Sequence, residues 1–272
     1  MKLKDKVALV TGSGSGIGRA IAVAFAREGA KVAVNDIDDA KIEETLQLVK
    51  GAGVEGMGLN ADVSSSSAVK AMFAKLLDRF GTIDVLVNNA GNTFGSTPRL
   101  EENVRTLLGQ MMTQGYSTTS LEVTRYMPDE VWDKLIKIHV NGTFYCTREA
   151  LAVMEEKRYG KIINMASAAS IVGMFPASHY GAAKGAILGF TKSVAGEVVV
   201  LGINVNAIGP GFIQTPLLDC VSPEMMMLIM AKTPIGYLGT PEDIAPLAVY
   251  LASDESRYVV GQIISPNGGE VI

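Results

Sequence analysis

Seven short apolar runs, separated by longer stretches with helical spacing, restrict the fold of this chain more than any other feature. Several of the runs are continuously apolar, which is typical of strands covered on both faces. Strand–helix–strand repetition predicts right-handed crossovers and an α/β fold with a doubly wound parallel sheet between two layers of helices. We expect strands at 7–12, 31–36, 54–63, 83–91, 161–167, 203–211 and 262–269, and helices at about 17–28, 39–51, 65–80, 129–156, 178–200 and 241–253.

Composition limits the class of protein. The 272 residues are 48% hydrophobic and 19% charged, with a net charge of −4 and no run of five basic residues. This balance is globular and argues against a nucleic acid or an anionic membrane surface as partner. Two cysteines, Cys146 and Cys220, are too few for a disulfide framework and fit the reducing cytosol. With no composition break, we expect a single domain over 1–272.

One segment, 92–127, has no strand signal although it separates an expected strand from an expected helix. Apolar residues within it keep a helical spacing and predict an amphipathic helix over 99–114. Segments this long usually have a function or structure of their own. Two alternatives remain open: a lid or wall over a pocket, and a surface insertion or subunit contact.

The sequence TGSGSGIG, residues 11–18, follows the first expected strand and opens the first expected helix. Gly12 turns the chain, Gly16 lets the backbone approach a ligand, and Gly18 lets helix and strand pack closely. Free N–H groups and the positive dipole end of the helix then face a pyrophosphate. The pattern predicts a dinucleotide cofactor.

An acidic residue ends the second expected strand and bears on the choice of cofactor. The carboxylate of Asp36 is suited to the adenosine ribose hydroxyls and would repel a 2′-phosphate. The cations close to it in sequence are Lys31 and Lys41. NAD is therefore favoured over NADP. Asp62 either caps the next helix or touches the adenine.

Tyr180 and Lys184 are one helical turn apart, with only Gly and Ala between them. Lowering a phenol pKa from about 10 to about 7 needs roughly 4 kcal/mol, which a neighbouring ammonium and an oxidised nicotinamide can supply. Tyr180 can then exchange a proton with an alcohol or a carbonyl while a hydride moves to or from the cofactor. Ser167, at the end of an expected strand, is placed to hold the substrate oxygen.

These motifs together resemble the short-chain dehydrogenases/reductases over nearly the whole chain. TGSGSGIG is similar to the family's cofactor turn, NNAG (88–91) to its sheet-stabilising motif, and GPGFIQT (209–215) to its nicotinamide-binding segment. Asn141 interrupts a helical run beside Gly142, and with Ser167, Tyr180 and Lys184 it resembles the family's catalytic tetrad.

The resemblance implies a Rossmann-type sheet in the order 3-2-1-4-5-6-7 and a homotetramer. It implies that Tyr180 is the general acid/base, that Lys184 lowers its pKa and binds the nicotinamide ribose, and that Ser167 polarises the substrate oxygen. Asn141 would use the helix kink to hold a water in a proton relay. Expected cofactor contacts are Gly12, Ser15, Gly16, Ile17, Gly18, Asp36, Asp62, Val63, Asn88, Ala90, Gly91, Tyr180, Lys184, Pro210, Ile213 and Thr215.

The substrate is less constrained by the sequence. The Met-rich run 225–230 either adapts to an apolar ligand or forms a helix that packs against the core or a neighbouring subunit. We expect a fairly apolar secondary alcohol or ketone, in a pocket formed by Phe94, Ala169, Phe175, Phe212 and Met226. His139 and His179 lack zinc-ligand spacing with either cysteine, so we expect structural roles for them and no metal.

Three other functions remain as alternatives. An epimerase or dehydratase could use the same Tyr/Lys pair, but too few residues follow Lys184 to build the longer substrate domain of such relatives. A non-catalytic dinucleotide-binding subunit would not need the complete set of acid/base residues. An NADP-dependent ketoreductase of the 3-oxoacyl type is the third alternative.

Overall fold

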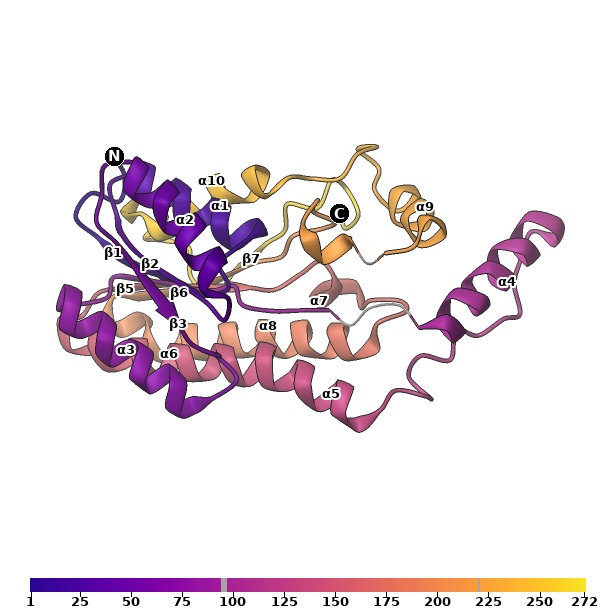
Figure 1. Ribbon diagram of the computed structural model, residues 1–272, viewed down its shortest axis with the longest axis horizontal. Coiled ribbons are helices and arrows are strands. Elements are labelled where there is room, and N and C mark those ends of the chain that lie inside the picture. The colour runs from indigo at the N-terminus through magenta and orange to yellow at the C-terminus, as the bar shows by residue number, and fades with distance from the viewer. Residues whose placement is uncertain (94–96, 220) are drawn as a thin grey trace.

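The computed structural model describes residues 1–93, 97–219 and 221–272. Its centre is a seven-stranded, all-parallel sheet in the order β3-β2-β1-β4-β5-β6-β7, which confirms the predicted order (Figure 1). The strands are β1 (Val7–Val10), β2 (Lys31–Asp36), β3 (Gly56–Asn60), β4 (Val85–Asn88), β5 (Gly160–Met165), β6 (Ile203–Ile208) and β7 (Ile263–Ile264).

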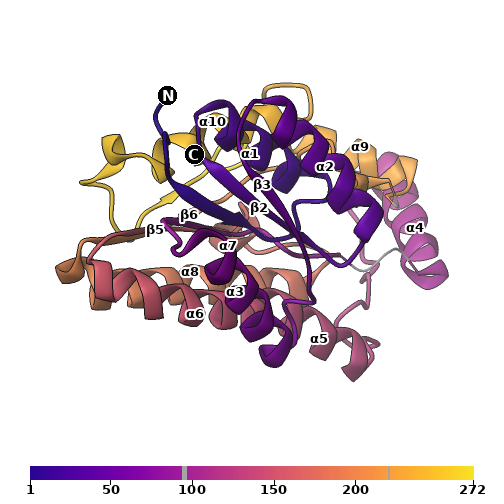
Figure 2. The same ribbon diagram turned by 60° about the vertical axis from the view of Figure 1, so that its left-hand side comes forward.

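Two apolar layers cover the sheet because side chains alternate along each strand. In β1, Ala8 and Val10 belong to one core cluster and Val7 and Leu9 to the other. The first layer contains α1 (Gly16–Arg27), α2 (Asp39–Gly51) and α10 (Pro241–Ala252). The second contains α3 (Ser66–Phe80), α6 (Gly142–Lys157) and α8 (Ser178–Val198), on the opposite face (Figures 1 and 2).

Several strands are shorter than the apolar runs that predict them. The seventh is limited to Ile263–Ile264 because the chain turns soon afterwards. The side chain of Asn267 donates to the Val271 carbonyl and accepts from the Gly269 N–H, at 3.0 and 2.9 Å. Gly268 and Gly269 both have positive φ angles, which end the extended conformation.

The helix expected over 129–156 is interrupted. It consists of α5 (Asp129–Ile136), a π-helical turn (Lys137–Asn141) and α6. At this turn Gly142 approaches Val63 so closely that a Cβ atom on the glycine would lie 2.8 Å from Cγ2 of the valine. The turn shifts the register of the helix and sets which side chains face the sheet edge.

The segment after β4 contains the expected helix, α4 (Pro98–Gln114). Thr97 caps its start by accepting from the Leu100 N–H, and Gly115 ends it with a φ of 78°. Val104 is the buried residue of α4, and the helix projects from the body of the molecule beside α9 (Pro223–Ala231) in Figure 1. Shorter helices are α7 (Ala169–Val172) and 3₁₀ turns at Val199–Leu201, Pro216–Leu218 and Asp254–Ser256.

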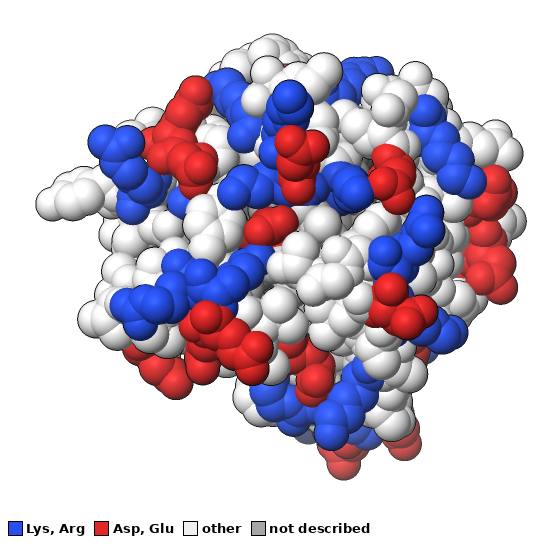
Figure 3. Space-filling view, turned by 90° about the vertical axis from the view of Figure 1, so that its left-hand side faces the viewer, with Lys and Arg blue, Asp and Glu red and all other residues white. Residues whose placement is uncertain are grey.

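Charged side chains of both signs are interspersed on the face shown in Figure 3. Lys31 pairs with Glu55 at 2.7 Å, and Lys2 pairs with Glu255 at 2.7 Å. Charges of opposite sign therefore lie close together on this face. Within the described ranges, no helix combines the length and the hydropathy needed to cross a bilayer.

Candidate active site

A cavity of about 400 Å³ lies at the carboxyl ends of the strands, where ligands bind in open α/β sheets. It collects residues from the glycine-rich turn, from the ends of β4, β5 and β6, and from the first turns of α8. The predicted residues that line it are Gly12, Ser15, Gly16, Ile17, Gly18, Gly91, Ser167, Ala169, Tyr180, Lys184, Pro210, Phe212, Ile213 and Thr215.

The glycine-rich turn forms a cradle that side chains would fill. Gly12 and Gly16 have φ angles of 59° and 53°, and a Cβ atom on Gly12 would lie 2.7 Å from Cα of Ala90. A Cβ atom on Gly18 would collide with the Gly12 carbonyl. Ser15 begins α1 without a side-chain capping bond, so the first N–H groups of the helix remain available. These features fit a dinucleotide pyrophosphate.

Asp36 lies beside this turn, at the end of β2. Its carboxylate accepts hydrogen bonds from the N–H groups of Gly14 and Ile37, at 3.0 and 2.8 Å. Two neighbouring cations are each paired with another carboxylate: Arg19 with Glu44 at 2.7 Å, and Lys41 with Asp38 at 3.7 Å. Neither Arg19 nor Lys41 is therefore a free cation that could attract a 2′-phosphate to the Asp36 carboxylate.

Asn88 and Asn89, the two asparagines of NNAG, lie in different environments. Asn88 is buried, and its Nδ2 donates to Thr147 Oγ1 at 3.0 Å and to Asn164 Oδ1 at 2.8 Å, which ties β4 to β5 and α6. Asn89 lines the cavity and donates to the carbonyls of Thr11 and Gly12, at 2.9 and 3.0 Å. Asn89 was not among the predicted site residues, although its place in the NNAG motif, directly after the end of β4, is a usable signal.

Asp62, Val63 and Ala90 support the site from outside the cavity. Asp62 accepts from the Ser64 N–H at 2.8 Å, and it is Ser65 that caps α3. Val63 packs against the π-helical turn at Gly142, and Ala90 packs under Gly12. Contact between Asp62 and an adenine stays a prediction.

Ser167, Tyr180 and Lys184 meet in the cavity. The Lys184 Nζ is 5.6 Å from the centroid of the Tyr180 ring and donates to the Met165 carbonyl at 2.6 Å. Burial lowers the pKa of Lys184 to about 7. Burial also raises the pKa of Tyr180, and a hydrogen bond with Ser167 partly opposes this. The combined effect of the Lys184 ammonium and an oxidised nicotinamide on the pKa of the phenol stays a prediction.

The π-helical turn directs His139 rather than Asn141 into the cavity. His139 lines the cavity and is 2% exposed, whereas Asn141 ends the turn and is not among the described lining residues. Gly91 makes room for the ring, since a Cβ atom there would lie 2.5 Å from Cε1 of His139. We expected a structural role for His139, and the sequence pattern did not show that it lines the cavity from the π-helical turn.

His139 is held as a neutral ring. Its Nε2 lies 2.8 Å from the Asn92 carbonyl oxygen, and its Nδ1 has no hydrogen-bond partner in the described chain. Burial and the nearby Lys184 charge lower the pKa of His139 to about 3. An unpartnered, buried ring nitrogen beside Tyr180 is a polar group that a ligand or water can satisfy.

The expected substrate pocket is divided. Ala169 and Phe212 line the cavity, whereas Phe175 lines a second cavity beside it. Met226 lies on α9 and lines neither among the described residues, and Phe94 lies outside the described residues. No group of three or more His, Cys, Asp or Glu side chains is arranged to hold a metal ion within 1–93, 97–219 and 221–272.

Comparison with known proteins shows the family. A family model described as "short chain dehydrogenase" matches residues 6–225. The chain belongs to the short-chain dehydrogenase family. It is an NAD(P)-dependent oxidoreductase that acts on CH–OH or keto groups.

Relatives match this short-chain dehydrogenase over nearly their full length. It is 35% identical to the (2S)-[(R)-hydroxy(phenyl)methyl]succinyl-CoA dehydrogenase subunit BbsD of Thauera aromatica, covering 99% of this chain and 98% of the relative. It is 34% identical to the 3-oxoacyl-[acyl-carrier-protein] reductase FabG of Thermotoga maritima, covering 100% of both. A crystal structure of a short-chain type dehydrogenase/reductase from Mycobacterium marinum matches with a TM-score of 0.86 and 29% identity, covering 99% of this chain and 97% of that one.

Proposed function

We propose that this short-chain dehydrogenase interconverts a fairly apolar secondary alcohol and a ketone, with NAD as cofactor and Tyr180 as general acid/base. The observation that carries the proposal is a shared cavity: Ser167, Tyr180 and Lys184 line the same space as the glycine-rich turn. A substrate carbon can therefore lie beside both the phenol and a cofactor held by that turn.

Ser167 and Tyr180 together hold the substrate oxygen. The Ser167 hydroxyl donates to that oxygen. The Tyr180 phenolate takes a proton from the alcohol during oxidation, and the Tyr180 hydroxyl gives a proton to the ketone oxygen during reduction. The bound cofactor supplies the hydride acceptor or donor. Lys184, fixed by its bond to the Met165 carbonyl, favours the phenolate whenever it is protonated.

His139 positions the phenol in this proposal. Its ring is fixed against the backbone of Asn92 and packs on Tyr180, and it stays neutral because it is buried. A neutral ring leaves the charge balance between Tyr180 and Lys184 undisturbed.

Asp36 supports NAD as the cofactor. Its carboxylate closes over Gly14, and a 2′-phosphate beside it would be repelled because Arg19 and Lys41 are already paired. Exposed Trp132 on α5 and Phe144 on α6 support the further proposal of a homotetramer, since such side chains are enriched at interfaces.

A second candidate is the NADP-dependent reduction of a 3-oxoacyl thioester. The printed names of the relatives favour it, because FabG is named for 3-oxoacyl-[acyl-carrier-protein] and BbsD for a succinyl-CoA derivative. Asp36 argues against NADP, and the two candidates differ in both cofactor and substrate.

A substrate panel tests the proposal directly. Secondary alcohols are offered with NAD and with NADP, and 3-oxoacyl thioesters with the reduced forms, while the NAD(P)H absorbance is followed. We expect steady NADH formation from alcohols, with kcat/KM at least about tenfold higher for NAD than for NADP. Thioester reduction with NADPH as the sole strong activity would favour the second candidate, and an absence of net NADH would favour an epimerase.

A further inference from the structure

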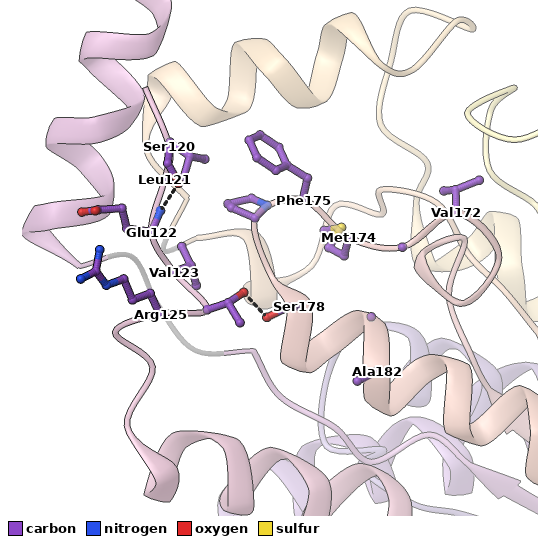
Figure 4. Close-up of a pocket in the computed structure, with 14 residues that line it drawn as sticks. Ser120, Leu121, Glu122, Val123, Arg125, Val172, Met174, Phe175, Ser178 and Ala182 are labelled. Carbon is purple, nitrogen blue, oxygen red and sulfur yellow. Dashed lines mark hydrogen bonds between the residues drawn. The ribbon is translucent and has the colours of Figure 1, made fainter. Parts of the chain in front are cut away.

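Figure 4 shows a second cavity, of about 700 Å³. It lies next to the cavity lined by Ser167, Tyr180 and Lys184, which we call the reaction cavity. One wall comes from 120–125, after α4, and the other from the loop and helix start at 172–182. Its volume is in the range of small-molecule sites. Two segments some fifty residues apart therefore border a partly open space that the reaction chemistry does not use.

The two cavities adjoin through shared and neighbouring residues. Met174 lines both of them. Gly181 and Ala182, which line the second cavity, directly follow Tyr180, which lines the first. The segment 120–125 is anchored to the same helix start, because Thr124 Oγ1 lies 2.8 Å from Ser178 Oγ. A substrate whose reacting carbon lies at Tyr180 has this space within reach of its remaining atoms.

Two apolar side chains of the cavity are exposed to water. Val172 is 61% exposed and Phe175 60% exposed, and the partly buried Val123 and the buried Leu121 line the other wall. Apolar surface left open to water is stabilised when an apolar group covers it. Exposed apolar residues gathered beside an active site are typical of a ligand-binding groove.

The polar groups of the cavity are engaged elsewhere. The hydroxyls of Thr124 and Ser178 bond to each other. The Glu122 carboxylate accepts from the Arg99 Nε at 3.0 Å, and the Arg125 guanidinium lies 5.2 Å from the Tyr126 ring centroid. In Figure 4 the side chains of Glu122 and Arg125 extend away from Met174 and Phe175. The middle of the cavity is thus left to apolar contacts.

We propose that this second cavity binds the non-reacting alkyl or aryl group of the substrate, so that 120–125 selects substrates by the size of that group. The inference rests on the proposed function, because it takes the reacting carbon to lie at Tyr180. It assigns the segment after α4 as a wall of the substrate site, which was one of the two alternatives for 92–127.

Two matched variants test the proposal. Ala182→Phe fills the cavity from α8, whereas Ala186→Phe makes the same change one turn later, at an exposed position outside the cavity lining. Val123→Phe narrows the cavity from the opposite wall, and it keeps the test valid if Ala182→Phe does not fold. The readout is kcat/KM for 2-alkanols of increasing chain length.

For the wild type we expect kcat/KM to rise about fourfold per added methylene until the cavity is full. Ala182→Phe should lower kcat/KM for the longest alkanols at least about tenfold while changing the shortest about twofold or less. Ala186→Phe should follow the wild type. A wild-type profile that is flat with chain length, or an equal loss in both variants, would overturn the proposal.

Binding of a non-reacting alkyl amide, measured by calorimetry, separates this proposal from the proposed function. If the amide binds the wild type and Ala182→Phe weakens it, the cavity assignment stands even where no alcohol is oxidised. If alcohols are oxidised but amide affinity ignores chain length, the function stands and the cavity assignment fails. An affinity that increases when a CoA group is attached, whatever the length of the acyl chain, would also overturn the cavity assignment.

Discussion

The ring of His139 is nearly perpendicular to the ring of Tyr180, with an interplanar angle of 82° and centroids 5.8 Å apart. This edge-to-face contact is a favourable aromatic geometry, and it fixes one side of the phenol. The π-helical turn at Lys137–Asn141 creates it by bringing His139 to the sheet edge. The environment of the proposed acid/base thus depends on a helix irregularity.

The first prediction concerns which residue of that turn matters for turnover. We expect His139→Gln to lower kcat about tenfold, because the phenol loses its aromatic support, with little change in KM for NAD. Asn141→Ala should lower kcat less. Steady-state kinetics of both variants provide the comparison, and a larger loss at Asn141 would restore the water-relay role implied by the family resemblance.

The buried histidine also makes stability depend on pH. Because the pKa of His139 is lowered to about 3, the unfolded state binds a proton between about pH 6.5 and 3 that the folded state does not. Stability is therefore lost as pH falls through this window. Between pH 7 and pH 5 the wild type should lose about 2 kcal/mol more than His139→Gln. Urea unfolding at both pH values measures this, and equal losses would contradict a neutral buried ring.

The cofactor preference should change with Asp36. We expect Asp36→Asn to raise KM for NAD. We also expect it to lower the ratio of kcat/KM for NAD to kcat/KM for NADP about tenfold, because the carboxylate that repels a 2′-phosphate is removed. Asp78→Asn is the control, because it makes the same change at an exposed position of α3, on the opposite face of the sheet. An unchanged ratio in Asp36→Asn would speak against the assignment of NAD.

Asn88 should matter for stability more than for cofactor binding. Asn88→Ala leaves the acceptors on Thr147 and Asn164 without their donor, which costs about 1–3 kcal/mol when such groups are buried. Chemical denaturation measures the loss, and KM for NAD measures any direct contact. A raised KM with unchanged stability would instead support the expected position beside the adenine ribose.

The sequence was sufficient for the features that depend on local pattern. Continuous apolar runs predicted the strands, and the glycine spacing predicted the turn beside α1, because both follow from backbone geometry near in sequence. The strand order came from the family resemblance. Bonds from the Asn267 side chain shortened β7, and no apolar pattern carries that information.

Two features of the site could not be predicted from the sequence pattern. Asn141 was predicted from its place beside Gly142 and from the family resemblance, and neither signal shows that His139, two residues earlier in the π-helical turn, lines the cavity. Burial of Tyr180 depends on segments distant in sequence, and it raises the pKa of the phenol, an effect that the spacing to Lys184 does not show. Pair spacing predicts proximity but not desolvation.

Turnover by Tyr180→Phe tests the central claim most directly. The variant keeps the ring against His139 and removes only the hydroxyl that exchanges the proton. With an alcohol that the wild type oxidises well, we predict that kcat falls at least about 100-fold while NAD binding, followed by fluorescence, is retained. Oxidation at the wild-type rate by a folded, NAD-binding Tyr180→Phe enzyme would contradict the account.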